Sequence, residues 1–163
     1  MKRIGLLSDT HGSFPDQTFT FFKDCDEIWH CGDFGNIEVA DKLSTFKTLR
    51  GVFGNIDGHE IRSEYPETQI FEIGQLKVAM IHIGGYPGKY SFQSREIIQK
   101  EKPGLFVCGH SHILKVIYDH KYELLHINPG AAGNYGLHQV ITLVRFTIDG
   151  KEIKDLEIFE KTR

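Results

Sequence analysis

Seven polar side chains of metal-binding type follow short apolar segments of the chain. They are Asp9, His11, Asp33, Asn55, His82, His110 and His112. Carboxylate, amide and imidazole ligands without a thiolate favour Mn²⁺, Fe or Zn²⁺ and suit Mg²⁺ less well. Because seven ligands are more than one ion uses, these residues predict a site for two ions, which could clamp a phosphoryl group and activate a water molecule.

The motifs differ in how strongly each one indicates metal binding. His110-Ser111-His112 is the strongest, because imidazoles two residues apart in an extended segment reach the same side. Asp9-Thr10-His11 has the same spacing, but an aspartate that caps a helix beside a surface histidine is an open alternative. Gly32-Asp33 and Gly54-Asn55 could be ordinary turns. The case for a metal site therefore depends on the whole set.

The composition narrows the class of protein. With 163 residues, of which 40% are hydrophobic and 25% charged, the chain fits one globular domain, expected over residues 1–163. A net charge of −3 argues against stable binding to nucleic acid or to an anionic membrane. The apolar runs of the sequence are too short for a membrane span or a signal segment. The three cysteines fit no disulfide framework. A cytoplasmic location is therefore expected.

Two patterns of secondary structure are expected along the chain. Up to about residue 52, strands alternate with helices, which predicts parallel pairing, and the later part is rich in hairpins. Strands are expected at 3–8, 27–30, 47–52, 67–73, 76–82, 105–108, 113–118, 122–127, 139–148 and 153–160, and helices at 15–24, 37–46 and 92–100. The prediction is an α/β layered fold with a parallel first half and a largely antiparallel second half. In such sheets the loops at the carboxyl ends of parallel strands form the ligand crevice, and the polar motifs fall in those loops.

In order and approximate spacing, these motifs resemble the signature of the calcineurin-like metallophosphoesterases. The motifs are Asp9-x-His11, Gly32-Asp33, Gly54-Asn55, His82 and Gly109-His110-x-His112. The similarity is greatest to the small single-domain branch of prokaryotic phosphodiesterases, to which the retromer subunit of the same fold is related. It runs from residue 3 to about 145 and includes Asn128-Pro129-Gly130. It implies a layered α-β-β-α sandwich with two mixed sheets.

The resemblance also implies roles for the seven residues. One metal ion would be held by Asp9, His11, Asp33 and His112. The other would be held by Asp33, Asn55, His82 and His110, with Asp33 bridging the two ions. A hydroxide between the ions would attack phosphorus in line, which makes the chain a dinuclear phosphodiesterase of small phosphate diesters. Asp33 and Asn55 would take part in catalysis, and Asn55 would also contact the substrate. Mn²⁺ is the expected ion, with Fe, Zn²⁺, Ni²⁺ or Mg²⁺ as alternatives.

The sequence departs from the family pattern in two places. Many larger members carry a histidine after the Asn of the Gly-Asn motif, where this chain has Ile56, so a leaving-group acid is missing. His59 or Asp57 could replace it, although His59 fits a plain surface role equally well. After His82 the chain continues with a glycine-rich loop, in which Lys89 could contact the substrate; a mobile surface loop is the alternative.

The remaining histidines and aromatic residues have mostly structural interpretations. His30 could orient Asp33 or simply pack in the core. His120, His126 and His138 show no ligand spacing and are expected to be structural or exposed. The aromatic residues of the helix expected at 15–24 belong to the core or, if exposed, would support a homo-oligomer.

The sequence is compatible with two functional classes. The complete ligand set favours a phosphodiesterase. The missing acid at Ile56 favours a catalytically weak or inactive scaffold, or binding module, on the same fold. Metal binding alone would not separate them, whereas turnover would.

Overall fold

Two five-stranded sheets packed face to face form the centre of the protein. The structure is a computed structural model and describes residues 1–163. The first sheet contains β1 (Lys2–Leu7), β2 (Glu27–His30), β3 (Thr48–Gly51), β11 (Val140–Asp149) and β12 (Glu152–Thr162). Its strand order is β12-β11-β1-β2-β3. Strands β1, β2 and β3 are parallel, whereas β11 runs antiparallel to both β1 and β12. The parallel first half is therefore as predicted.

The second sheet is also mixed. It contains β4 (Thr68–Ile73), β5 (Leu76–Ile81), β8 (Leu105–Val107), β9 (Leu114–Asp119) and β10 (Leu124–Pro129), in the order β4-β5-β8-β10-β9. The edge strands β4 and β9 are antiparallel to their neighbours, and the three central strands are parallel to one another. A helix connects β5 to β8, which allows the parallel pairing that a short hairpin could not make. A two-stranded ribbon, β6 (Gly85–Tyr86) and β7 (Lys89–Tyr90), follows β5.

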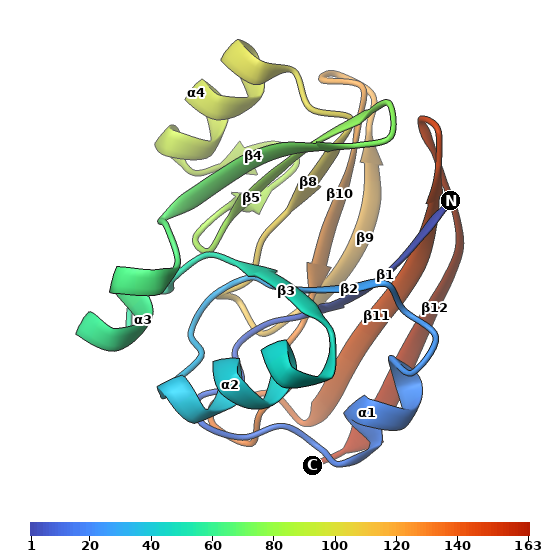
Figure 1. Cartoon of the computed structure of the whole chain (residues 1–163). Coiled ribbons are helices and arrows are strands. Elements are labelled where there is room, and N and C mark those ends of the chain that lie inside the picture. The colour runs from blue at the N-terminus through green and yellow to red at the C-terminus, as the bar shows by residue number, and fades with distance from the viewer.

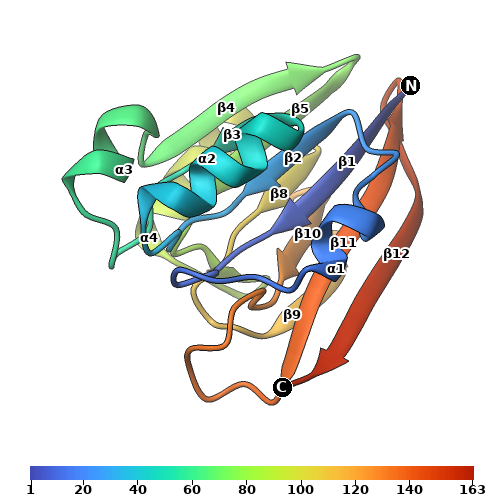
Figure 2. The same ribbon diagram turned by 60° about the horizontal axis from the view of Figure 1, so that its bottom comes forward.

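Four helices flank the sheets. They are α1 (Gln17–Phe21), α2 (Ile37–Phe46), α3 (His59–Glu64) and α4 (Phe92–Glu101). Helices α1 and α2 lie on the first sheet and α4 lies on the second, which gives the expected α-β-β-α layers (Figures 1 and 2). None of these helices combines the length and the apolar character that a membrane span requires.

Helix boundaries follow local chemistry. Helix α2 begins where predicted, because the side chain of Asn36 caps the backbone N–H of Val39. Helix α1 is shorter than the helix expected at 15–24, and its N-cap, Asp16, makes no side-chain capping bond. Helix α3 was not predicted, because its six residues bury only one apolar side chain, Ile61, and show no apolar period.

Alternating side chains along the central strands fill two separate layers of core. Leu6 and Trp29 point between the sheets, where they pack with Met80, Val107 and other residues of the second sheet. Their neighbours Leu7 and Ile28 point the other way and pack under α1 and α2. This period of two fixes the strand register, because a slip of one residue would move every apolar side chain to the wrong face. The strand ends, and the loops after them, are held in place as a result.

Candidate metal centre

All seven predicted ligands lie just after the carboxyl ends of strands. Asp9 and His11 follow β1, Asp33 follows β2, and Asn55 follows β3 in the first sheet. His82 follows β5, and His110 and His112 follow β8 in the second sheet. Because these strands run in the same direction within each sheet, their loops meet at one end of the sandwich. The structure therefore brings together residues that are up to about a hundred positions apart in the chain.

Five of the seven residues have a left-handed backbone. The φ angles are 53° at Asp9, 46° at His11, 59° at Asp33, 73° at His110 and 63° at His112. Only eight non-glycine residues of the protein have positive φ, so this conformation is concentrated at the site. Each such residue costs on the order of 1 kcal/mol or more, and a fold keeps this strain where function requires it. The backbone is thus bent to aim these side chains inward.

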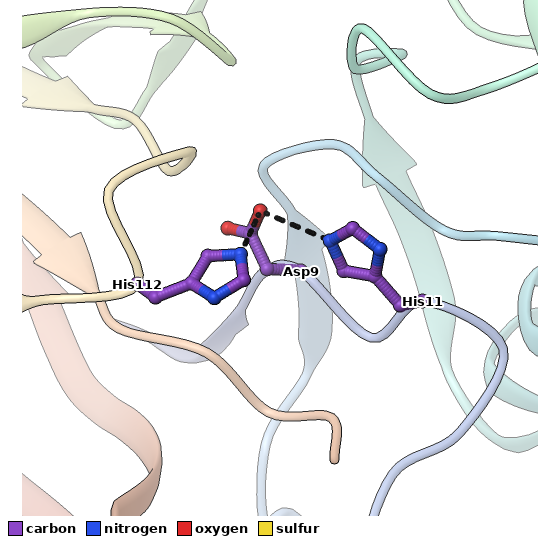
Figure 3. Close-up of side chains that lie close together, drawn as sticks. All are labelled: Asp9, His11 and His112. Carbon is purple, nitrogen blue, oxygen red and sulfur yellow. Dashed lines mark ion pairs between the residues drawn. The ribbon is translucent and has the colours of Figure 1, made fainter. Parts of the chain in front are cut away.

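The first group of ligand atoms belongs to Asp9, His11 and His112, whose ligand atoms lie within 4.8 Å of one another. The Oδ1 atom of Asp9 lies 3.3 Å from Nε2 of His112 and 3.8 Å from Nε2 of His11. Figure 3 shows both imidazoles turned toward this carboxylate from opposite sides. Two imidazole nitrogens and one carboxylate oxygen are a common set of ligands for a divalent cation.

The second group consists of Asp33, His82 and His110, again with ligand atoms within 4.8 Å. The Oδ2 atom of Asp33 lies 3.2 Å from Nε2 of His82 and 3.4 Å from Nε2 of His11. Asp33 therefore faces one imidazole of each group. Asn55 joins the second group, because its Oδ1 atom lies 3.1 Å from Nδ1 of His110.

Hydrogen bonds assign the tautomers of two imidazoles. Nδ1 of His82 lies 2.6 Å from the carbonyl oxygen of Cys31, which only accepts, so Nδ1 carries the proton. Nε2 of His138 lies 2.7 Å from the carbonyl oxygen of Gly133, so Nδ1 of His138 accepts from Nδ1 of His112 at 3.2 Å. With Nδ1 as the protonated nitrogen, the neutral ring of either His82 or His112 has its lone pair on Nε2, the atom that faces the carboxylates and that a metal ion would bind.

Three buried atoms of the cluster have no hydrogen-bond partner. They are Oδ1 of Asp9, Nε2 of His11 and Nε2 of His82. Buried polar atoms are almost always paired, because an unpaired one costs about 1–3 kcal/mol. A divalent cation between the carboxylates and imidazoles would satisfy all three atoms. The donor set and its unpaired atoms therefore fit metal ions.

Both carboxylates are ionised at neutral pH. Burial opposes the charge of Asp9, but the imidazoles of His11, His112 and His82 outweigh it and hold the pKa of this carboxyl well below its usual range. Burial likewise opposes the charge of Asp33, whose pKa is lowered by His82 and by the backbone N–H of Ile56. Burial lowers the pKa of His110, which keeps this imidazole neutral and able to bind a metal ion.

Buried polar side chains hold the ligand loops in place. The carboxylate of Asp57 accepts hydrogen bonds from the backbone N–H groups of Asp33, Phe34, Gly35 and Gly54, at 2.8–3.2 Å. It therefore joins the loop after β2 to the loop after β3, and both of its oxygens accept hydrogen bonds from these loops. Asn128 acts similarly on the loop after β8, since its amide donates to the carbonyl oxygen of Gly109 and to Oγ of Ser111.

Two glycines of the motifs are needed for close packing at the site. A Cβ atom on Gly54 would lie 2.0 Å from Oδ1 of Asp33, and one on Gly109 would lie 2.1 Å from Oγ of Ser8 and 2.8 Å from Oδ2 of Asp9. No side chain can occupy either place without moving a carboxylate. The glycines of the Gly-Asn and Gly-His motifs thus leave room for the proposed ligands.

Three residues singled out in the sequence are exposed to solvent. His59 is the exposed first residue of α3, and Lys89 is exposed on β7; neither forms a hydrogen bond or an ion pair with the ligand cluster. Their catalytic and substrate-binding roles stay predictions. Ile56 is 47% exposed, and its backbone N–H donates to Oδ1 of Asp33 at 3.1 Å. Its side chain therefore stands at the opening of the site without a titratable group.

His30 does not contact the side chain of Asp33. Its Nδ1 atom accepts from the backbone N–H of Gly32 at 3.1 Å, and its Nε2 atom lies 3.0 Å from Oγ1 of Thr10. Burial lowers the pKa of His30 to about 3, so the ring is neutral. Its position is structural, because it ties the loop after β1 to the end of β2.

Two residues of the site, His138 and Arg62, could not be recognised from the sequence. His138, expected to be structural or exposed, orients a candidate ligand; it lies 26 positions from His112 without a motif that would reveal the contact. Arg62 lines a cavity of about 240 Å³ together with Asn55 and His82. Its guanidinium donates to the carbonyl oxygens of Gly54, Asn55 and Asp57, so it also braces the loop that carries Asn55.

Replacing His138 by Phe is expected to weaken metal binding about 10- to 100-fold at the group of Asp9, His11 and His112. Loss of a hydrogen-bond partner behind a histidine ligand typically has an effect of this size. Titration of the metal-free protein with Mn²⁺ in a calorimeter would measure it. The matched control is His120→Phe, an exposed histidine outside the site. Unchanged affinity of the His138 variant would contradict the orienting role.

Fold and site together define a phosphoesterase of the metal-dependent α/β class. The chain belongs to the calcineurin-like phosphoesterase superfamily, because the domain model of that family matches residues 1–151. This superfamily uses divalent metals, and the ligand groups described above are candidates to hold them.

Known proteins of similar length share the sequence or the fold. A probable metallophosphoesterase of Methanothermobacter thermautotrophicus is 29% identical over 160 residues, covering 95% of this chain and 90% of the relative. The crystal structure of Vps29 from Chaetomium thermophilum has a TM-score of 0.77 at 14% identity and full coverage of both chains. Wild-type Vps29 of Entamoeba histolytica, solved in complex with Zn²⁺, has a TM-score of 0.74 at 18% identity, with 98% of each chain covered. The chain thus has the length and the fold of these small proteins.

Proposed function

We propose that the protein is a dinuclear metal-dependent phosphodiesterase that hydrolyses small phosphate diesters. The observation that supports it best is the position of Asp33. Its Oδ2 atom lies 3.4 Å from His11 and 3.2 Å from His82, so one carboxylate faces an imidazole of each ligand group. A carboxylate oxygen has the lone pairs that a bridging ligand needs.

The ligand groups suggest how two ions would be shared. Asp9, His11, Asp33 and His112 would hold one ion, and Asp33, Asn55, His82 and His110 would hold the other. When bound, such a pair of ions neutralises charge on the phosphoryl oxygens and lowers the pKa of water toward about 7. We propose Mn²⁺ as the ion, since the ligands mix carboxylate, amide and imidazole without sulfur; Fe, Zn²⁺, Ni²⁺ or Mg²⁺ are alternatives.

The residues around the ligands support a diester more than a monoester. A diester carries one negative charge near neutral pH, whereas a monoester carries up to two. Arg62, the cation of the cavity beside Asn55 and His82, already donates to three backbone carbonyl oxygens. With few free cations at the site, a singly charged substrate is favoured.

Hydrolysis of bis-p-nitrophenyl phosphate by purified, metal-stripped protein would test the proposed function. We expect no turnover without metal and clear turnover after Mn²⁺ is added, because p-nitrophenolate leaves without an acid. Asp41, an exposed aspartate of α2, provides the control variant Asp41→Ala, which should keep full activity. Absence of turnover in protein that holds two ions would refute the proposal.

The alternative function is a scaffold or binding module on the same fold, catalytically weak or inactive. The observation in its favour is Ile56, an exposed apolar side chain at the position where many larger members carry a histidine. Two bound ions without hydrolysis of any activated ester would support this alternative. Metal-dependent turnover would exclude it as the sole role.

Replacing Ile56 by His should raise the rate on poor leaving groups more than on good ones. The exposed side chain stands at the opening of the site, next to Asp33, where an imidazole could protonate a departing alkoxide. General acid catalysis contributes about 10²- to 10⁴-fold, so a gain of about tenfold or more is expected on an alkyl ester. Rates on methyl and p-nitrophenyl diesters would be compared, with His59→Ala to test the other candidate acid. An equal gain on both esters would argue against this account.

A further inference from the structure

A second cavity adjoins the metal centre on the side of the second sheet. It has a volume of about 220 Å³ and is bounded by the ribbon β6–β7 and by strands β9 and β10. His110 and Ser111 line it, so it is continuous with the ligand cluster. A group attached to a phosphate at the metal centre could therefore extend into this space.

The walls of this cavity are apolar and aromatic. Ile83, Tyr86 and Ile113 line it, together with Lys115 of β9. The Nζ atom of Lys115 lies 4.5 Å from the centre of the Tyr86 ring, in the position of a cation–π contact. An ammonium group beside a ring also attracts the face of a second aromatic ring. This combination selects for an aromatic group over an aliphatic one.

His126 adds a polar group with no partner in the protein. It lines the same cavity, is fully buried, and neither of its ring nitrogens is hydrogen bonded. Burial lowers the pKa of His126 to about 4, so the neutral ring offers one donor and one acceptor. Since buried polar atoms are rarely left unpaired, an unpaired imidazole in the wall of a cavity points to a ligand.

We infer that this cavity binds an aromatic ester group of the substrate, so that the natural substrates are phosphate esters with a single planar ring next to the phosphate. The inference rests on the proposed function for the position of the phosphate. The cavity volume of about 220 Å³ limits the size of the bound group, because it is smaller than that of most ligand pockets, which measure about 300–1,000 Å³. An apolar cavity of about 150 Å³ holds one benzene ring, so this space fits one ring with few substituents.

The test uses ligands that are not hydrolysed. Binding of phenylphosphonate, cyclohexylphosphonate and methylphosphonate to the Mn²⁺-loaded protein would be measured by calorimetry. Because burial of the additional apolar surface of a ring favours binding, phenylphosphonate should bind about tenfold or more tightly than methylphosphonate. It should also bind more tightly than cyclohexylphosphonate if the ring must be aromatic. Equal affinity of the phenyl and methyl compounds, or of the phenyl and cyclohexyl compounds, would overturn the inference.

A variant of the cavity wall, compared with a variant outside the cavity, tests whether the phenyl preference comes from this cavity. Tyr86→Ala should reduce the preference for phenyl over methyl to about twofold or less, while methylphosphonate binds as before. Tyr118→Ala is the matched control, since this tyrosine is also partly exposed but lines a different cavity. Loss of the preference in both variants, or in neither, would contradict the assignment.

The outcomes distinguish this inference from the proposed function. A phenyl preference in protein that hydrolyses no diester would keep the cavity as an aromatic-binding site and refute the enzyme. Hydrolysis of bis-p-nitrophenyl phosphate without a phenyl preference would keep the enzyme and refute the subsite.

Discussion

The Asp33→Ala variant is expected to lose phosphodiesterase activity about a thousandfold or more and to bind fewer than two ions. Asp33 faces both His11 and His82 at 3.2–3.4 Å, closer than Asp9, whose Oδ1 atom lies 3.8 Å from Nε2 of each of these histidines. Its loss would remove a ligand from both proposed metal positions, and metal ions supply several kcal/mol of stabilisation to the transition state. Hydrolysis of bis-p-nitrophenyl phosphate and metal content by elemental analysis would measure both effects.

Two further variants make the Asp33 experiment specific. Asp33→Asn keeps the shape of the side chain and its acceptor oxygen for the backbone N–H of Ile56, but it removes the charge. We expect it to be nearly as inactive as Asp33→Ala, while its thermal unfolding without metal stays close to that of the original protein. Asp41→Ala should behave as the original protein in every assay. Full turnover with Asp33→Ala would refute the bridging role and the dinuclear site.

The proximity of the candidate ligands could be predicted from the sequence, because these residues are tied to the most regular part of the fold. Each ligand follows a buried strand, and the apolar pattern that defines the strand also defines where it ends. Asp9 and Asp33 follow the parallel strands β1 and β2, so their proximity follows from the pairing of these strands. The layered α/β fold was predicted for the same reason, because apolar runs such as Arg3–Ser8 mark strands that are buried on both faces.

Residues that act through irregular loops could not be predicted. His138 contacts His112 only because the loop after β10 turns back over the site. Arg62 lies on α3, a helix too short to show a period. Tyr135, which stacks on His11 with ring centroids 4.8 Å apart, belongs to the same loop as His138. Such contacts depend on loop conformation, which has no repeating pattern in the sequence.

Asp57 shows how one pattern can support two different interpretations. In the sequence it was a candidate to replace the leaving-group acid that is missing at Ile56. In the structure this carboxylate is buried and points away from solvent to accept four backbone N–H groups. A group engaged in this way positions the ligand loops and does not donate a proton. The hydrogen bonds that decide the role of Asp57 cannot be recognised from residue types alone.

The Asp57→Ala variant is expected to lose about 3–5 kcal/mol of stability, the largest effect on folding that we predict. The substitution leaves the backbone N–H groups of Asp33, Phe34, Gly35 and Gly54 without their acceptor. A buried donor left without a partner costs about 1–3 kcal/mol, and several of them are lost together. For a chain of this length the loss corresponds to a decrease in Tm of about 10 °C, which thermal unfolding of the metal-free protein would measure.

Metal binding should weaken together with stability in the Asp57 variant, because the loops that carry Asp33 and Asn55 lose the group that joins them. Asp57→Asn should have an intermediate effect: the amide oxygen can still accept from some of the N–H groups, but its NH₂ group cannot accept from the others. Asp41→Ala again provides the control for loss of an aspartate. A Tm within about 2 °C of the original for Asp57→Ala would show that water replaces the carboxylate and that the two loops are held by other contacts, such as those of Arg62 with the loop after β3.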